Sequence, residues 1–302
     1  MSLLTNTGVP HVHLLDAGLI NMPEYTGVFL VDTESPVIIE TGFSYSVPNI
    51  LQGLEELNIS PEDVKYIIPT HIHMDHAGGA GGLAQACPNA QVFVYDKVAR
   101  YLIDPADLVK SVERAVGSLF ERYGEMIPIP EERMIKVDGG ETFQLQDDFS
   151  LKIIHAPGHA PHQFCVFVPE HHALFTADAC GIFLKEIGKL SVTTPPPAFR
   201  LGEALETLNQ LKALNPKTLL YTHYGAYKAE NRLDDYADAL MRWVTDIEAI
   251  YNTTEDFESI RNHFIKKLLP DYDGHYDSLM SKEEIGMNVI GVLLYLKRQR
   301  EN

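Results

Sequence analysis

Short runs of β-branched and aliphatic residues, separated by turn residues, open the chain. Residues 11–18 (HVHLLDAG), 26–33 (TGVFLVDT) and 35–42 (SPVIIETG) follow this pattern and predict an antiparallel meander. Residues 64–69 form a further apolar run, which we expect to be a buried strand, and residues 91–96 (QVFVYD) predict the next strand. The first third of the chain is therefore expected to build a sheet.

Two segments are expected to be helical, one between the last two of these strands and one after them. Residues 76–87 are expected to be helical. Residues 97–125 predict an inserted helical segment, because apolar side chains recur on one helix face. The apolar positions are Val98, Tyr101, Leu102, Leu108, Val112, Ala115, Val116 and Phe120.

Strand patterns return after the inserted segment and predict a second β-rich half. They cover residues 134–145, 149–158 and 162–178, with DGGE (138–141) and PEHH (169–172) expected to be hairpin turns. A helix is predicted over 202–214, ended by Asn215 and Pro216, and a strand over 218–223.

Only helical patterns remain after residue 229. Ser281 and Glu284 have the spacing of a capping box ahead of the apolar stretch 285–300. We therefore divide the chain into a catalytic domain of residues 1–228, which includes the helical insertion at about 97–125, and a C-terminal helical extension of residues 229–302.

Composition and charge narrow the classes of partner. The 302 residues are 45% apolar, enough for a sizeable core, and carry a formal net charge of -18. This charge repels phosphate backbones and anionic lipids, so we expect neither nucleic acid nor a membrane surface as partner. The N-terminal residues lack the pattern of a signal peptide, and a cytoplasmic location is expected. The odd set Cys87, Cys165 and Cys180 suggests reduced, buried thiols.

Candidate chemistry is concentrated in residues 69–82, which read PTHIHMDHAGGAGG. Imidazole and carboxylate are ligands that suit Zn, Fe or Mn. Alternate side chains of an extended segment point the same way, so His71 and His73 can bind one ion while Asp75 and His76 face a second. The paired glycines that follow are expected to let the backbone pack closely beneath this site.

Two ions need more ligands than this loop offers, and later strands supply them. His159, Asp178 and His223 each follow an apolar strand, as the first cluster does. Tyr224 comes directly after a candidate ligand and is expected either to hydrogen-bond a substrate carbonyl or oxyanion or to pack. Among the other histidines, His155 and His162 are expected to support ligands or pack rather than to act directly. His171 and His172 are expected to be exposed, and His11 and His13 are left without function.

The order H-x-H-x-D-H, then His in a P-G-H turn, then Asp, then His, resembles the metallo-β-lactamase fold superfamily over roughly residues 8–228. The resemblance is to its glyoxalase II and lactonase-like branch, with the substrate unassigned. It implies an α/β, four-layer αββα sandwich with added C-terminal helices, and Asp178 as a bridge between two metals. It also implies two ligand sets, which are His71, His73 and His159 on one metal and Asp75, His76 and His223 on the other.

One residue departs from the family pattern. The family often has an Asp in the motif at VIIETGFS, where it supports the ligand histidines, and this chain has Glu40 there. A longer carboxylate can still orient an imidazole.

These observations predict a hydrolase that uses two divalent metal ions, zinc first, with iron or manganese as alternatives. The ions would turn a shared water into hydroxide near neutral pH, and Asp75 would orient it toward a lactone, ester or thioester carbonyl of a small molecule. The alternative is an oxidoreductase similar to persulfide dioxygenases with one iron. The helical additions are expected to cover the metal cleft or to form the surface of a homodimer.

Overall fold

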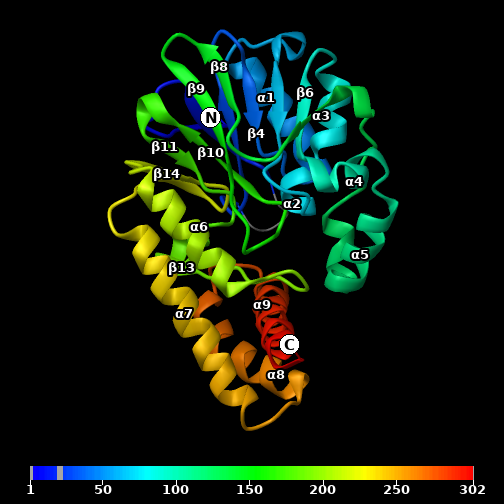
Figure 1. Ribbon diagram of the computed structural model, residues 1–302. Coiled ribbons are helices and arrows are strands. Elements are labelled where there is room, and N and C mark those ends of the chain that lie inside the picture. Colours follow the sequence, from blue (N-terminus) through cyan, green and yellow to red (C-terminus); the bar gives the residue numbers. More distant parts are fainter. Residues whose placement is uncertain (1–2, 19–22, 302) are drawn as a thin grey trace.

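The computed structural model describes residues 3–18 and 23–301, in which two β-sheets pack face to face between layers of helices (Figure 1). Apolar side chains fill the space between the sheets and cover the outer face of each sheet beneath the helices. The expected αββα sandwich with added C-terminal helices is confirmed.

The first sheet is antiparallel at one side and parallel at the other. β1 to β4 pair antiparallel, which confirms the predicted opening meander, and β4 to β7 pair parallel. Its strands, in spatial order, are β1 (Leu4–Asn6), β2 (Val12–Asp16), β3 (Gly27–Val31), β4 (Val37–Ile39), β5 (Tyr66–Ile68), β6 (Gln91–Tyr95) and β7 (Met134–Val137).

The second sheet has the spatial order β15-β14-β11-β10-β9-β8. All its neighbours are antiparallel except β11 and β14, which run parallel. Its strands are β8 (Thr142–Gln146), β9 (Phe149–His155), β10 (Phe164–Val168), β11 (Ala173–Phe175), β14 (Thr218–Tyr221) and β15 (Gly225–Lys228). A separate ribbon pairs β12 (Ile182–Leu184) with β13 (Lys189–Ser191).

One of the two predicted hairpins is present and the other is wrong. The turn at 169–172 joins β10 to its antiparallel neighbour β11. The turn at 138–141 instead carries the chain from β7 in the first sheet to β8 in the second. Turn residues report a change of direction, and they do not say which sheet receives the next strand.

Alternation along the strands builds the core. In β2 and β3, Leu14 and Phe29 point between the sheets, whereas Leu15 and Val28 point to the outer face of the first sheet. This is the two-residue period of a strand buried on both faces. The outer face is covered by α1 (Val47–Glu56) and α3 (Ala80–Ala86), and α6 (Leu201–Ala213) covers the second sheet.

The helix expected over 76–87 is two helices, α2 (Met74–Ala77) and α3. Between them the backbone N–H of Gly79 donates to the carbonyl of Gly42 at 3.1 Å. A Cβ at Gly79 would lie 2.4 Å from the carbonyl oxygen of Thr41, so only glycine permits this approach. The expected close packing of the paired glycines is confirmed.

The inserted segment is helical, as predicted, with α4 (Arg100–Ile103) and α5 (Ala106–Val116) followed by a 3-10 turn over Gly117–Arg122. The C-terminal helices are α7 (Arg232–Tyr251), α8 (Phe257–Leu268) and α9 (Ser278–Glu301). They lie at one end of the sandwich, next to the ribbon that contains β13 (Figure 1). No helix in the described part of the chain is long and apolar enough to cross a membrane.

The predicted capping box at Ser281 is wrong, because α9 begins three residues earlier. The carboxylate of Asp277 accepts the backbone N–H of Met280 at 2.9 Å and so caps the helix. Ser281 is buried within the first turns, and Glu284 points away from the cap to bond Tyr25.

Candidate metal centre

The predicted ligands lie at one edge of the sandwich, because the strands that precede them end there. β5 leads to His71, β9 to His159, β11 to Asp178 and β14 to His223. Within each sheet these strands share a direction, so their carboxyl ends meet at the same edge, where ligand sites of such sheets form.

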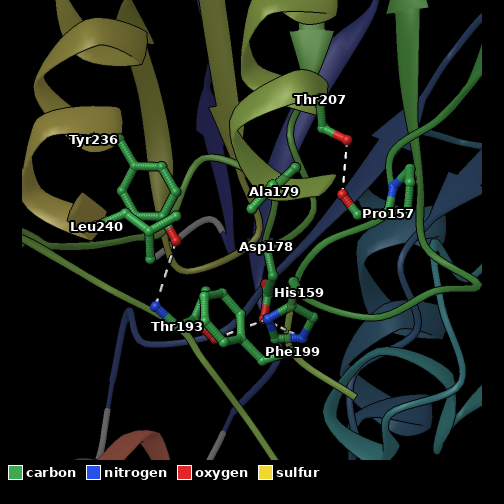
Figure 2. Close-up of a pocket in the computed structure, with 10 residues that line it drawn as sticks. Pro157, His159, Asp178, Ala179, Thr193, Phe199, Thr207, Tyr236 and Leu240 are labelled. Carbon is green, nitrogen blue, oxygen red and sulfur yellow. Dashed lines mark hydrogen bonds and ion pairs between the residues drawn. The ribbon is translucent and has the colours of Figure 1, made fainter. Parts of the chain in front are cut away.

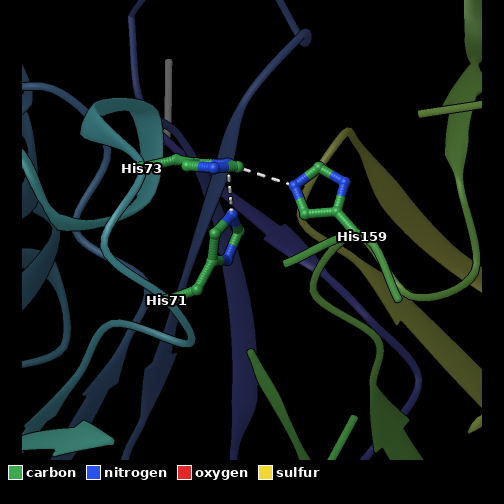
Figure 3. A group of neighbouring side chains, drawn as sticks. All are labelled: His71, His73 and His159. Carbon is green, nitrogen blue, oxygen red and sulfur yellow. Dashed lines mark hydrogen bonds between the residues drawn. The ribbon is translucent and has the colours of Figure 1, made fainter. Parts of the chain in front are cut away.

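The first set consists of His71, His73 and His159, whose rings converge in Figure 3. Nδ1 of His73 lies 2.9 Å from Nε2 of His71 and 3.1 Å from Nε2 of His159. Two nitrogens on one tetrahedral zinc ion lie about 3.4 Å apart, given Zn–N bonds of roughly 2.1 Å. A small outward movement of the rings would therefore make room for an ion.

The second set consists of Asp75, His76 and His223. Oδ2 of Asp75 lies 3.5 Å from Nε2 of His76 and 3.5 Å from Nε2 of His223. These separations match the spacing of two ligands on one tetrahedral ion, about 3.4 Å.

Asp178 lies between the two sets. Its Oδ2 is 3.4 Å from Nε2 of His159, and its Oδ1 is 3.4 Å from Nε2 of His76 and 3.5 Å from Nε2 of His223. Its two oxygens thus face different sets, which is the arrangement expected of a bridging carboxylate.

Glu40 orients two of the histidines. Its Oε1 accepts from Nδ1 of His76 at 2.9 Å and from the hydroxyl of Thr70 at 2.7 Å. That hydroxyl in turn accepts from Nδ1 of His71 at 3.1 Å. Both rings therefore carry their proton on Nδ1 and present Nε2 to the centre. The expectation that Glu40 can do the work of the family's usual aspartate fits this geometry.

Two more ligand histidines, His159 and His223, also form a hydrogen bond through the ring nitrogen that points away from the centre. Nδ1 of His159 donates to the hydroxyl of Thr193 at 3.0 Å, and the backbone N–H of Thr193 donates to the hydroxyl of Tyr236 (Figure 2). Nδ1 of His223 donates to the backbone carbonyl of Tyr25 at 3.1 Å, and the two rings meet edge to face. Four of the five histidines are thus held in the orientation that a metal ligand needs.

Two buried polar atoms at this centre have no hydrogen-bond partner, Nε2 of His76 and Oδ1 of Asp178. Buried groups of this kind are almost always satisfied in folded proteins. Both atoms point into the second set, and both are atoms that bind metal ions. The donor set, its spacing and these two atoms fit divalent metal ions.

Protonation states in the first set also suit metal binding. Burial and then the neighbouring histidines lower the pKa of His71 well below its usual range. Burial lowers the pKa of His159 to about 3, although Asp178 acts in the opposite direction. These imidazoles are therefore neutral at physiological pH and need lose no proton to bind an ion.

The carboxylates in and around the second set stabilise positive charge there. Burial would raise the pKa of Asp178, but His76, His159 and His223 outweigh it and hold that pKa well below its usual range. Burial would lower the pKa of His76, and the carboxylates of Glu40, Asp178 and Asp75 raise it well above its usual range. Ionised carboxylates thus surround a place where a cation is stabilised.

One side of the centre is open. His73 and Asp75 are partly exposed, whereas His71, His76, His159, Asp178 and His223 are buried. Tyr123 of the insertion lies near this side, where burial and then the carboxylates of Asp75 and Glu284 raise its pKa. A cavity of about 10 Å³ beside His159 and Asp178 holds at most one water molecule.

The catalytic role expected for Tyr224 is not supported. Its ring is buried among the apolar side chains between the sheets, against Gly27, and its hydroxyl bonds Thr5. The position after His223 turns the side chain toward the core, so Tyr224 packs. His155 also packs, stacked on Tyr95.

His162 lies beside the centre, with its ring about 6 Å from those of His71 and His73. The two histidines expected to be exposed differ: His172 is exposed, and His171 is partly buried against Phe149. The three cysteines are free and buried, as expected.

Sequence patterns missed Tyr25, Thr193 and Glu284. Tyr25 and Thr193 hold ligands through one hydrogen bond each, and Glu284 bonds the hydroxyl of Tyr25 across 259 residues of chain. No local signal marks Tyr25 or Thr193. Glu284 was misread as part of a helix cap.

Comparisons with known proteins agree with this geometry. The profile of the metallo-beta-lactamase superfamily matches residues 23–223, which include all seven predicted ligands. The metallo-beta-lactamase fold-containing protein ST1585 of Sulfurisphaera tokodaii is 30% identical over 219 residues, covering 71% of this chain and 78% of the relative. An N-acyl homoserine lactonase of a Bacillus species is 25% identical over 226 residues, covering 74% and 75%.

Solved structures share the fold over nearly the whole chain. The crystal structure of a metallo-beta-lactamase family protein, TTHA1429 from Thermus thermophilus, has a TM-score of 0.72 at 18% identity, covering 97% of this chain and 95% of its own. That of ST1585 has a TM-score of 0.70 at 24% identity, covering 96% and 98%. With the profile and the ST1585 sequence both spanning most of the sandwich, the chain belongs to the metallo-β-lactamase superfamily.

Proposed function

We propose that this protein is a hydrolase that uses two divalent metal ions to cleave a carbonyl-type bond, a lactone, ester or thioester, in a small molecule. The observation that carries the proposal is the pair of ligand sets at one edge of the sandwich, with the two oxygens of Asp178 facing different sets. His71, His73 and His159 would hold one ion, and Asp75, His76 and His223 the other.

Divalent ions in these positions supply Lewis acidity toward a carbonyl oxygen and acidify water. The protein's own contribution begins with Asp75. Its side chain is 27% exposed, against 5% for Asp178, so it is the carboxylate that faces an incoming substrate. Burial would raise its pKa, but His76 and His223 hold that pKa well below its usual range. Asp75 is thus ionised and can orient an attacking water by accepting its hydrogen bond.

The names of relatives support acyl chemistry. They include N-acyl homoserine lactonases, a hydroxyacylglutathione hydrolase and an atrochrysone carboxyl ACP thioesterase. The net charge of -18 also disfavours polyanionic substrates such as phosphodiesters of nucleic acid.

Nitrogen and oxygen donors without thiolate suit zinc, and also iron or manganese. The complete second set argues for two ions. A single iron bound by the first set would leave the second set without a role as ligands. Yet His76 and His223 of the second set are oriented by hydrogen bonds at Nδ1, as metal ligands are.

Elemental analysis of the purified protein, together with hydrolysis assays on lactones, aryl esters and thioesters, tests this proposal. About two metal ions per chain with turnover of one bond class is the expected result. About one iron per chain, with oxygen consumption and no hydrolysis, would contradict it and favour the oxidoreductase.

A further inference from the structure

His162 belongs to neither ligand set, but its ring lies against the first set. The ring centroid of His162 is 6.1 Å from that of His71, with 28° between the two planes, and 6.0 Å from that of His73. His71 is buried, whereas His73 and His162 are both partly exposed. His162 therefore lies on the open side of the centre, next to the first set.

A β-turn over 160–163 fixes the position of this ring. The backbone N–H of Gln163 donates to the carbonyl of Ala160 at 3.3 Å and closes the turn. Pro161 and His162 are its two central residues, and proline suits the first of these positions because its φ is fixed. The side-chain oxygen of Gln163 accepts the backbone N–H of Asp178 at 3.3 Å. The turn that carries His162 is thus tied directly to a candidate ligand.

Neither ring nitrogen of His162 has a hydrogen-bond partner among the described residues. Nδ1 is buried and unpaired, which is rare for a polar atom in a folded protein. Since Nδ1 is buried, the partial exposure of the side chain belongs to the opposite edge of the ring, which carries Nε2. Burial, followed by His73 and His159, lowers the pKa of His162 to about 3, so the ring is neutral and carries one N–H. A neutral donor is therefore held beside the first set without a protein acceptor.

The proposed reaction brings an acceptor to this place. When water adds to a substrate carbonyl, the carbonyl oxygen gains negative charge, and an N–H group already aimed at that oxygen stabilises the charge. Asp75, which is proposed to orient the water, belongs to the second set. The side of the first set, where His162 lies, is thus left for the carbonyl oxygen.

We propose that His162 is a catalytic residue that donates a hydrogen bond from Nε2 to the carbonyl oxygen of the substrate. This inference rests on the proposed hydrolysis of a carbonyl-type bond and names the group of the protein that recognises the reacting oxygen. It requires the neutral tautomer of His162 with its proton on Nε2.

Three replacements of His162 separate hydrogen bonding from packing. His162→Phe keeps an aromatic ring beside His71 but has no nitrogen. His162→Gln can place an amide N–H near the position of Nε2, whereas the shorter amide of His162→Asn cannot reach it. We expect kcat/KM for esters to fall about 100-fold in His162→Phe and His162→Asn, mainly through kcat, and to stay within about tenfold of the wild type in His162→Gln. Metal content and Tm should be kept in all three variants.

Butyrate, the acid released from a butyryl ester, tests the contact without turnover. Calorimetric titration of the zinc-loaded protein should show a Kd for butyrate that rises about tenfold in His162→Phe and His162→Asn and less than about threefold in His162→Gln. Nuclear magnetic resonance of labelled histidines should show the proton of His162 on Nε2 and a shift of its ring signals when butyrate binds. His155 is the internal control, because it stacks on Tyr95 and bonds the carbonyl of Pro161, so its signals should not move.

The outcomes separate this inference from the proposed function. Unchanged hydrolysis and unchanged butyrate affinity in His162→Phe would overturn the role of His162 alone. Equal losses in all three variants, with a lower Tm in each, would show a structural role and overturn it as well. The contrast between His162→Gln and His162→Asn decides the question even where His162→Phe folds poorly. Butyrate binding that depends on His162, in a protein that hydrolyses no ester, lactone or thioester, would overturn the proposed function and the catalytic role that rests on it.

Discussion

At the scale of single residues, the candidate metal centre depends on neighbouring residues that hydrogen-bond its ligands and fix their orientation. Glu40 has its backbone in the left-handed region, with φ of 66°, a conformation that costs energy for a residue with a side chain. The carboxylate reaches His76, Thr70 and Thr222 from this position. We infer that the backbone conformation is kept because it places the carboxylate under the ligands.

Replacing Glu40 tests this role. Glu40→Gln keeps the shape but can turn an N–H toward His76 and removes the charge that favours its protonated Nδ1. We expect metal affinity, measured by competition with a chelator, to fall about 10- to 100-fold. Glu170→Gln is the control, because Glu170 likewise accepts from a serine and its backbone but lies away from the centre. Unchanged metal affinity in Glu40→Gln would show that Glu40 only supports the fold.

Asp178 faces both ligand sets, so its loss should affect both ions. Asp178→Ala is expected to lower the metal content of both sets and to reduce kcat/KM at least about 100-fold, since losing a ligand exceeds the effect of losing its supporting partner. Asp32→Ala removes a carboxylate that contacts two histidines outside the centre, His11 and His13, and should leave metal content unchanged. A fully loaded and active Asp178→Ala variant would contradict the bridging role.

At the scale of elements, four of the seven predicted ligands follow strand ends, and the other three come after His71 in the same motif. His71, His159, Asp178 and His223 follow apolar runs whose strand character is local, and strands that share a direction end at one edge. Tyr25, Thr193 and Glu284 escaped prediction because their roles arise from contacts between elements far apart in the chain. The turn at 138–141 shows the same limit, since its residues do not reveal that the chain changes sheets.

Glu284 joins helix α9 to the candidate metal centre, because it accepts a hydrogen bond from Tyr25. The pH dependence of the protein's stability tests this contact. Burial raises the pKa of Glu284, while the hydrogen bond from Tyr25 and the nearby His223 act against this. A carboxyl whose pKa is raised on folding stabilises the protein fully below its unfolded pKa of about 4.3, and this contribution is lost as pH rises through the folded pKa. Glu284→Gln cannot ionise, so its Tm relative to the wild type should increase from pH 4.5 to pH 8.

The neighbouring residue provides the control for that measurement. Glu283 is more exposed and pairs with Arg261 at 2.9 Å, so Glu283→Gln should show no such increase. A difference in Tm between Glu284→Gln and the wild type that stays constant with pH would mean that folding does not raise the pKa of Glu284.

At the scale of the whole molecule, the C-terminal extension and the second sheet share one core. Phe167, Leu219 and Tyr221 of the sheet lie in the same apolar cluster as Leu240, Phe264 and Val292 of the extension. The insertion also meets the extension, where Arg122 contacts Asp277 at 3.4 Å. The boundary near residue 229 stays a prediction about sequence organisation, and these contacts argue against independent folding of the two parts.

Thermal unfolding can decide whether the molecule is one cooperative unit. Trp243 emission reports the extension, and far-UV circular dichroism reports all elements; a shared core predicts that the two transitions coincide. Metal ions bind only the folded centre, so adding zinc to the metal-free protein should raise both transitions together by several degrees. A chain of residues 1–228 would expose the apolar face that α7 and α9 cover and should aggregate. An earlier Trp243 transition that does not respond to zinc would instead show that the extension melts by itself, and the contacts through Glu284 and Asp277 would then contribute little to its stability.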